Sequence, residues 1–253
     1  MCWNPAVTDW DPSTYGEHVA DVYDQVFTAR FEAEVTPATV ELLAGLAGPG
    51  PVLELAVGTG RVALPLAGRG LPVQGIDASP AMVSRLRAKP GGDAIPVTIG
   101  DFADVGVEGT FSLVFVVFNT FFALLTQDDQ LRCFANVASH LDAGGAFVIE
   151  AFVPDLTRFD RGQRVGVFGL GPEAVHLDAS RHDLATQRIS SRHLLLSDQG
   201  TRILPVELRY AWPSELDLMA RLGGLRLRQR WGGWQKEPFD SSSPGHVSVY
   251  EKE

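Results

Sequence analysis

Short apolar runs alternate along residues 11–152 with segments whose apolar side chains recur at helical spacing. Continuous apolar runs of this length are typical of parallel strands, because both faces of such strands are covered. The expected strands span 51–57, 71–76, 96–99, 111–118 and 146–152, and the expected helices span 11–31, 37–46, 61–67, 80–88 and 128–141. This alternation predicts an α/β fold, an open parallel sheet with helices on both faces.

The pattern changes after Pro154. From about 163 to 211 the chain shows short β-like runs and few helical signals, and Ser197-Asp198-Gln199-Gly200 is typical of a hairpin turn. We therefore expect a small antiparallel β insertion over 155–211. The last expected elements are a helix and two strands, at 213–222, 225–231 and 246–251.

Glycine and acidic residues stand where the predicted strands end. Glu54, Gly58-x-Gly60, Asp77 and Asp101 each lie at or just after a strand. Parallel strands bring these ends to one edge of the sheet, where ligands of such sheets bind. Asp77 follows Gly58 by 19 positions, the usual offset of a carboxylate that binds both ribose hydroxyls. The spacing predicts a site for a nucleoside-type cofactor.

Three segments then resemble motifs of the class I S-adenosylmethionine-dependent methyltransferases, in order and in spacing. They are VLELAVGTGRVALPLA (52–67), GIDASPAMV (75–83) and GDFADV (100–105). The resemblance covers roughly 15–152 and 213–251. It implies a Rossmann-like, doubly wound, mainly parallel seven-stranded sheet whose last strand is antiparallel.

The same resemblance implies S-adenosylmethionine as cofactor and S-adenosylhomocysteine as product. In such enzymes the positions of Gly58 and Gly60 face the methionine part, and the carboxylate at Asp77 binds the ribose. The adenine lies between the positions of Ala78 and Met82, with Asp101 and Phe102 beside it. Ala56 stands where the family usually has its first glycine. The full expected cofactor set is Glu54, Ala56, Gly58, Gly60, Arg61, Asp77, Ala78, Met82, Asp101, Phe102 and Phe118.

A closer resemblance is to bacterial small-molecule methyltransferases, including N-methyltransferases of nucleotide-linked amino sugars. It rests on the TYGEHVADVYD segment (14–24) and on a β insertion after the fifth strand. It implies Tyr15 and Tyr23 as site residues, and we add His246 as a candidate general base. Ala123 stands where the amino-sugar enzymes place a histidine. The expected acceptor contacts follow the fourth, fifth and sixth strands: Asn119, Phe122, Phe152 and Trp231.

These expectations divide the chain into a helical lid (1–50), a methyltransferase domain (51–154 and 212–253) and the insertion (155–211), which would form a substrate wall or a homodimer contact. We expect in-line transfer of a methyl group to N or O of a small molecule. Two alternatives stay open. GTGRVA (58–63) also fits an NAD(P)-dependent oxidoreductase, although no tyrosine has a lysine four positions later. A non-catalytic cofactor-binding regulatory protein is the other.

Composition limits the partners. The 21 Lys and Arg residues against 31 Asp and Glu give a formal net charge of −10, which argues against nucleic acid or an anionic membrane surface. The most apolar stretch, 111–125, is shorter than the ~20 residues that cross a membrane. Two cysteines, Cys2 and Cys133, are too few for a disulfide framework, so we expect free thiols and a cytoplasmic protein.

We expect no metal site. His176, His182 and His193 lie on neighbouring predicted strands, yet the usual zinc-ligand spacings are absent and neither cysteine is near them in sequence.

Overall fold

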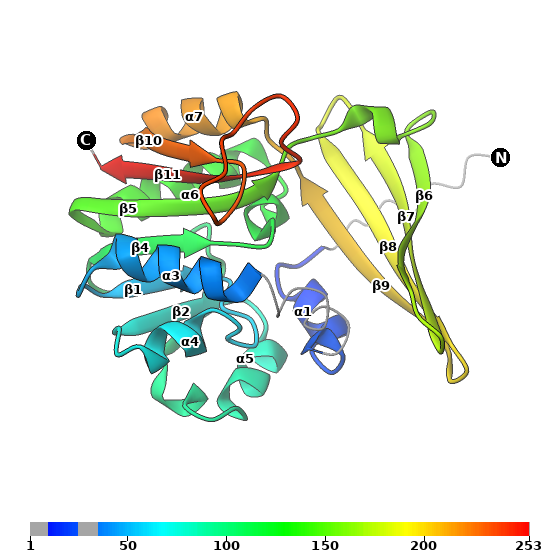
Figure 1. Cartoon of the computed structure of the whole chain (residues 1–253), viewed down its shortest axis with the longest axis horizontal. Helices are drawn as coiled ribbons and strands as arrows, with labels where there is room; N and C mark the ends of the chain where they lie inside the picture. The colour runs from blue at the N-terminus through cyan, green and yellow to red at the C-terminus, as the bar shows by residue number, and fades with distance from the viewer. Residues whose placement is uncertain (1–9, 25–34, 253) are drawn as a thin grey trace.

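The computed structural model describes residues 10–24 and 35–252. A seven-stranded sheet forms its centre (Figure 1), in the order β10-β11-β5-β4-β1-β2-β3. Its strands are β1 (Val52–Leu55), β2 (Val73–Asp77), β3 (Val97–Ile99), β4 (Phe111–Val116), β5 (Leu141–Phe152), β10 (Leu225–Trp231) and β11 (Gly245–Lys252). The neighbours among β1–β5 pair in parallel, and β11 runs antiparallel to both β5 and β10. The predicted Rossmann-like sheet with an antiparallel last strand is therefore confirmed.

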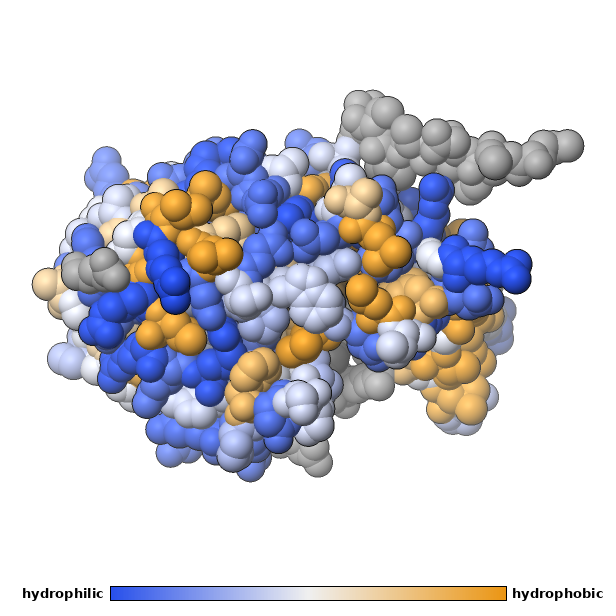
Figure 2. Space-filling view, turned by 90° about the horizontal axis from the view of Figure 1, so that it is seen from above, coloured by the Kyte–Doolittle hydropathy of each residue, from blue (hydrophilic) through white to orange (hydrophobic). Residues whose placement is uncertain are grey.

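The segment between β5 and α7 forms the predicted second sheet. It is an antiparallel meander of β6 (Gln163–Leu170), β7 (Ala174–Asp183), β8 (Arg188–Ser197) and β9 (Gly200–Arg209). Ser197 pairs with Gly200 across the predicted hairpin turn. Figure 1 shows this sheet beside the carboxyl edge of the central sheet, with α1 (Thr14–Val19) between that edge and β9. Apolar side chains gather at this end of the molecule (Figure 2).

Helices cover both faces of the central sheet. One face carries α3 (Val35–Ala47), α4 (Ala63–Gly68) and α5 (Pro80–Arg87), and the other carries α6 (Gln127–His140) and α7 (Pro213–Leu222). Successive strand residues point to opposite faces, so Phe115 packs in the α3–α4 cluster while Val114 and Val116 pack in the α6–α7 cluster. None of the described helices is long and apolar enough to cross a membrane. A cytoplasmic location stays a prediction.

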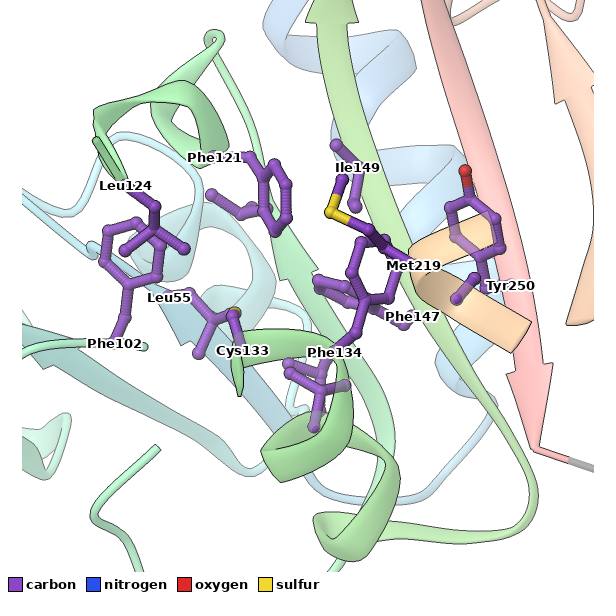
Figure 3. Close-up of a cluster of buried hydrophobic side chains, with 14 of the residues drawn as sticks. Leu55, Phe102, Phe121, Leu124, Cys133, Phe134, Phe147, Ile149, Met219 and Tyr250 are labelled. Carbon is purple, nitrogen blue, oxygen red and sulfur yellow. The ribbon is translucent and has the colours of Figure 1, made fainter. Parts of the chain in front are cut away.

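An aromatic cluster packs between α6 and the sheet at β5 and β11 (Figure 3). Phe134 of α6 meets Phe121, Phe147 and Tyr250 edge-on, with ring centroids 5.3, 5.5 and 5.5 Å away. Such pairs stabilise by ~0.5–1.5 kcal/mol beyond their burial. Cys133 lies in the same cluster as a free, buried thiol. These ring contacts hold α6 against the central sheet.

Some element boundaries differ from the sequence-based ones. β5 starts at Leu141 instead of 146, because Leu141 pairs with Phe111 before a register shift, and the next pair is Leu113 with Ala146. The expected helix over 11–31 appears as α1 and a following turn, and its residues 25–31 lie outside the described part of the chain, as does Cys2.

Candidate active site

The carboxyl edge of the central sheet opens into a cavity of about 1410 Å³. Its walls come from the ends of β1, β2, β4 and β5, from α1, and from the facing side of the antiparallel sheet. A pocket for one drug-sized ligand usually spans roughly 300–1,000 Å³. This cavity therefore has room for a cofactor and a small acceptor together.

Asp77 organises the glycine loop at this edge. The backbone N–H of Gly58 donates to Asp77 Oδ2 (2.7 Å), and that of Ser79 donates to Oδ1 (2.8 Å). Burial raises the pKa of the Asp77 carboxyl, against these two bonds. Ser79 also caps α5, since its hydroxyl accepts from Met82 N (3.2 Å). The carboxylate is thus held in one orientation at the mouth of the loop.

Three residues at this edge adopt left-handed backbone conformations although they are not glycine. The φ angles are 56° for Ala56, 58° for Phe118 and 64° for Asn119. Each such conformation costs about 1–3 kcal/mol and persists where the surrounding structure enforces it, often at functional sites. At Ala56 the angle explains why a glycine would suit this position. All three line the cavity.

Glu54 and Arg61 lie near one another behind the glycine loop, close enough for the charge of Arg61 to act on Glu54. Glu54 is 4% exposed, and burial raises the pKa of its carboxyl well above the usual range, against the nearby positive charge of Arg61. Its Oε2 has no hydrogen-bond partner among the described residues. The Arg61 guanidinium stacks over the Phe118 ring at 3.5 Å and donates to Tyr23 Oη (3.1 Å). Glu54 itself does not belong to the cavity lining.

Asp101 and Phe102 extend the same wall beyond β3. Both line the cavity that Asp77 also lines, together with Ala78 and Met82. Burial raises the pKa of Asp101, whose Oδ1 accepts from Ala103 N (2.9 Å). Of the acidic and glycine positions that the sequence places at strand ends, Gly58, Asp77 and Asp101 therefore meet around one space, and Glu54 and Gly60 do not line it.

This wall fits S-adenosylmethionine. Gly58 has a φ of +57°, and a Cβ built there would lie 3.4 Å from Met82 Cε at the cavity wall. Bare backbone therefore faces the space, as close approach to a ligand requires. The Asp77 carboxylate, which lines the cavity, supplies acceptors for hydroxyl groups.

Helix α1 covers the cavity as a docked segment. Gly16 packs so closely that an added Cβ would lie 2.4 Å from Ser79 Cβ. Glu17 Oε1 accepts from Ser79 Oγ (2.8 Å) and from Ala81 N (3.2 Å). Tyr15 and Tyr23 line the cavity, and burial raises the pKa of both phenols.

Two ion pairs hold the segment after α1 in place. Asp24 pairs with Lys89 (2.8 Å), and its other oxygen accepts from Thr59 Oγ1 (2.7 Å). Asp21 pairs with Arg202 of β9 (2.7 Å). The segment is thereby tied to both the central sheet and the antiparallel sheet.

Several expected site residues lie outside the cavity lining: Glu54, Gly60, Phe122, Trp231 and His246. Phe122 is fully buried and packs edge-on against Phe152 at 5.0 Å, and Phe152 does line the cavity. Trp231 packs in the α3–α4 cluster, and Gly60 lies under Leu86.

His246 is 1% exposed on β11 and shares a hydrogen bond with Ser248 Oγ (2.8 Å). Burial, reinforced by the Arg230 charge, lowers its pKa to about 3. A neutral imidazole away from the cavity has no access to an acceptor, so we leave His246 out of the catalytic group.

The sequence analysis missed a polar wall on the inner face of the antiparallel sheet. Asp178, Ser180, Ser191 and His193 line the cavity from β7 and β8. Asp178 lies opposite His193, and the Ser180 and Ser191 hydroxyls are 2.8 Å apart. Polar residues recur at every second position over 176–182 of β7, and that alternation could have indicated the wall once the facing side was known.

The three insertion histidines do not converge. His176 Nε2 lies 3.1 Å from His193 Nδ1, whereas His182 Nε2 lies 3.0 Å from Tyr210 Oη. Across residues 10–24 and 35–252 no group of three His, Cys, Asp or Glu side chains is arranged to hold a metal ion. His140, on α6, approaches the backbone oxygens of Asn136 and Val107.

Comparison with known proteins identifies the family. A family model described as "Methyltransferase domain" matches residues 52–145. The solved structure of the CcbJ methyltransferase from Streptomyces caelestis is 42% identical, covers 96% of this chain and 99% of that one, and gives a TM-score of 0.90. The cypemycin N-terminal methyltransferase of a Streptomyces species is 29% identical over 96% of this chain and 99% of that protein. A dTDP-4-amino-2,3,4,6-tetradeoxy-D-glucose N,N-dimethyltransferase from Saccharopolyspora spinosa is 29% identical over 75% and 77%. The chain belongs to the class I S-adenosylmethionine-dependent methyltransferases.

Proposed function

We propose that this enzyme methylates a nitrogen atom of a small-molecule acceptor held between the cofactor and the antiparallel sheet. The observation that carries the proposal is the single cavity of about 1410 Å³, which joins the Asp77–Asp101 edge to the polar wall of β7 and β8. A cofactor at the first end leaves its reactive methyl group facing the remaining volume. Nitrogen is favoured over oxygen because the names of two relatives describe N-methylation.

In the proposed cofactor pose, Asp77 accepts both ribose hydroxyls and Asp101 accepts from the adenine amino group. Phe102, Ala78 and Met82 flank the adenine. Gly58 leaves room for the methionine part, whereas Gly60 lies under Leu86 and supports the loop from outside the cavity. This arrangement follows the order of the residues along the edge, because β2 and β3 lie outward of β1.

When bound, the cofactor supplies a methyl group already activated by a sulfonium. The chain has to hold the acceptor nitrogen in line and keep water out, and such positioning can supply ~7–11 kcal/mol. Tyr15 of α1 and Tyr23, which follows that helix, can hold the acceptor, since both line the cavity. Burial raises the pKa of both phenols, so they keep their protons at neutral pH. Their hydroxyls therefore orient the acceptor by hydrogen bonds and do not act as phenolate bases.

We propose that α1 is a lid and that the inner face of the antiparallel sheet is the acceptor wall. The ties from Glu17, Asp21 and Asp24 support the first assignment. Asn119 and Phe152, at the exits of β4 and β5, would meet the acceptor from the opposite side. Asn119 Oδ1 accepts from Phe152 N (2.7 Å), which holds the two exits together.

The function is tested with purified protein, S-adenosylmethionine and a panel of small primary and secondary amines with matched alcohols. We expect S-adenosylhomocysteine to form only with certain amines, whose mass rises by one methyl group. Methylation of the alcohols alone would contradict nitrogen as the acceptor atom, and failure to bind the cofactor would contradict the whole assignment.

We also propose a homodimer through the outer face of the antiparallel sheet. Val165 and Ile203 do not line the cavity and are 73% and 55% exposed. Covering apolar area of this kind contributes ~25 cal/mol per Å², and β6 is an edge strand of its sheet. Light scattering should give twice the mass of 27.4 kDa, and Val165→Lys should give the monomer. A monomeric wild type would refute this assembly.

A further inference from the structure

Glu150 is a buried carboxylate at the end of β5 that the sequence did not single out. It lines the cavity, and its Oε2 accepts from the backbone N–H of Phe118 (2.8 Å). Its backbone oxygen accepts from Asn119 N (3.3 Å). One residue thus holds both left-handed positions at the exit of β4.

The Glu150 carboxyl lies at the cofactor edge, close enough to Arg61 to feel its charge. Burial raises the pKa of its carboxyl, opposed by the Phe118 bond, by Trp234 and by the charge of Arg61. Arg61 acts in the same way on the pKa of Glu54, so the charge of one guanidinium acts on both carboxyl groups. Asp77 also acts electrostatically on Glu54 and already accepts from two backbone N–H groups. Of the two carboxyl groups on which Arg61 acts, Glu150 is the one that faces the cavity.

We propose that Glu150 makes this site select the cationic cofactor over its neutral product. The inference rests on the proposed cofactor pose, in which the methionine end lies at the β1 and β4 exits. In the reaction a nitrogen–carbon bond forms and the sulfur–carbon bond breaks, and its electron pair stays on sulfur. The sulfonium becomes a neutral thioether, the positive charge moves to the acceptor nitrogen, and the proton leaves to solvent from there.

The carboxylate of Glu150 therefore attracts S-adenosylmethionine, which is cationic, and does not attract S-adenosylhomocysteine, which is neutral at sulfur. A unit charge several ångströms away, at an effective dielectric of ~20, changes binding by roughly ten-fold or more. Glu150 would thus promote both binding of the substrate form and release of S-adenosylhomocysteine.

The test is calorimetric titration of wild type and Glu150→Gln with three ligands. S-adenosylmethionine and sinefungin are cationic at the reacting position, and S-adenosylhomocysteine is neutral there. Gln keeps an oxygen for the Phe118 N–H, so the loop geometry is retained. We expect Glu150→Gln to weaken both cationic ligands by about ten-fold and S-adenosylhomocysteine by less than about two-fold. Asp198→Asn, in the exposed β8–β9 turn, removes the same charge far from the edge and should leave all three affinities unchanged.

A second measurement uses the unchanged protein. Because the pKa of Glu150 is raised by burial, its protonated fraction grows as the pH falls from neutral. The ratio of the two dissociation constants, S-adenosylhomocysteine over S-adenosylmethionine, should therefore fall toward lower pH. Glu54, Asp77 and Arg61 remain in Glu150→Gln, and the dependence should be weaker in that variant.

Equal weakening of all three ligands in Glu150→Gln would overturn the inference, because Glu150 would then act on loop shape alone. Unchanged affinities, or a pH-independent ratio in the wild type, would overturn it too. Failure of the wild type to bind any of the three ligands would refute the proposed cofactor pose itself, so the two failures are distinguishable.

Discussion

Replacing Asp77 with asparagine tests how the glycine loop and the ribose share one carboxylate. Both carboxylate oxygens already accept a backbone N–H, from Gly58 at 2.7 Å and Ser79 at 2.8 Å. An amide has one acceptor oxygen, so one N–H would face an NH₂ group and lose its partner. A buried donor left unpaired costs ~1–3 kcal/mol. The free energy of unfolding should fall by that amount, and the melting temperature by about 2–4 °C per kcal/mol.

Ligand binding should fall as well. Hydrogen bonds to a charged group contribute ~1.5–3 kcal/mol, so Asp77→Asn should weaken S-adenosylhomocysteine binding roughly ten- to a hundredfold. Calorimetry measures the affinity and urea unfolding measures the stability, with exposed Asp93→Asn as the matched control. A destabilised variant with unchanged affinity would show that Asp77 only supports the loop. If neither quantity changed, the role of Asp77 in both would be refuted.

Three further changes probe other parts of the molecule. His246 has a folded pKa of about 3, whereas an unfolded histidine titrates near ~6.5, so acidification stabilises the unfolded chain. The free energy of unfolding should lose about 2 kcal/mol through this group between about pH 7.5 and pH 5, and His246→Asn should reduce that loss; equal losses in urea titrations would contradict the burial argument. Ala56→Gly removes an alanine with a left-handed backbone and should raise the free energy of unfolding by about 1 kcal/mol. The control Ala67→Gly, in α4, should lower it by ~1 kcal/mol. A destabilised Ala56→Gly would show that the backbone at this position is unstrained. Gly16→Ala places a methyl group against Ser79. The overpacking costs ~1–3 kcal/mol and should weaken cofactor binding several-fold, whereas the control Gly45→Ala meets open space and should not. Unchanged affinity in Gly16→Ala would exclude α1 as a lid.

Local patterns were enough to predict the central sheet and its ligand edge. Apolar runs identify parallel strands, and the carboxyl ends of parallel strands share an edge, so Asp77 and Asp101 were expected at one space and do line one cavity. Ser79 and Pro80 were enough to place the start of α5, because the cap and the first helical position are both local.

The sequence did not show which face of a strand meets the core. On β11, every second residue from His246 to Tyr250 points to the α6–α7 side of the sheet. Only the packing of α7 and β10 decides which residues point to that side. The same uncertainty hid Asp178 and His193, since an antiparallel insertion can present either side to the site. Glu150 was missed for another reason, because it lies within an apolar strand and its partner, the Phe118 N–H, depends on two left-handed residues.

The most direct test of the whole account is a crystal structure of the protein with S-adenosylhomocysteine. The account predicts the ribose on Asp77, the adenine beside Asp101 and Phe102, and the sulfur facing the space under Tyr15 and Tyr23. A ligand bound away from the glycine loop, or turned so that its sulfur faces away from the antiparallel sheet, would contradict it.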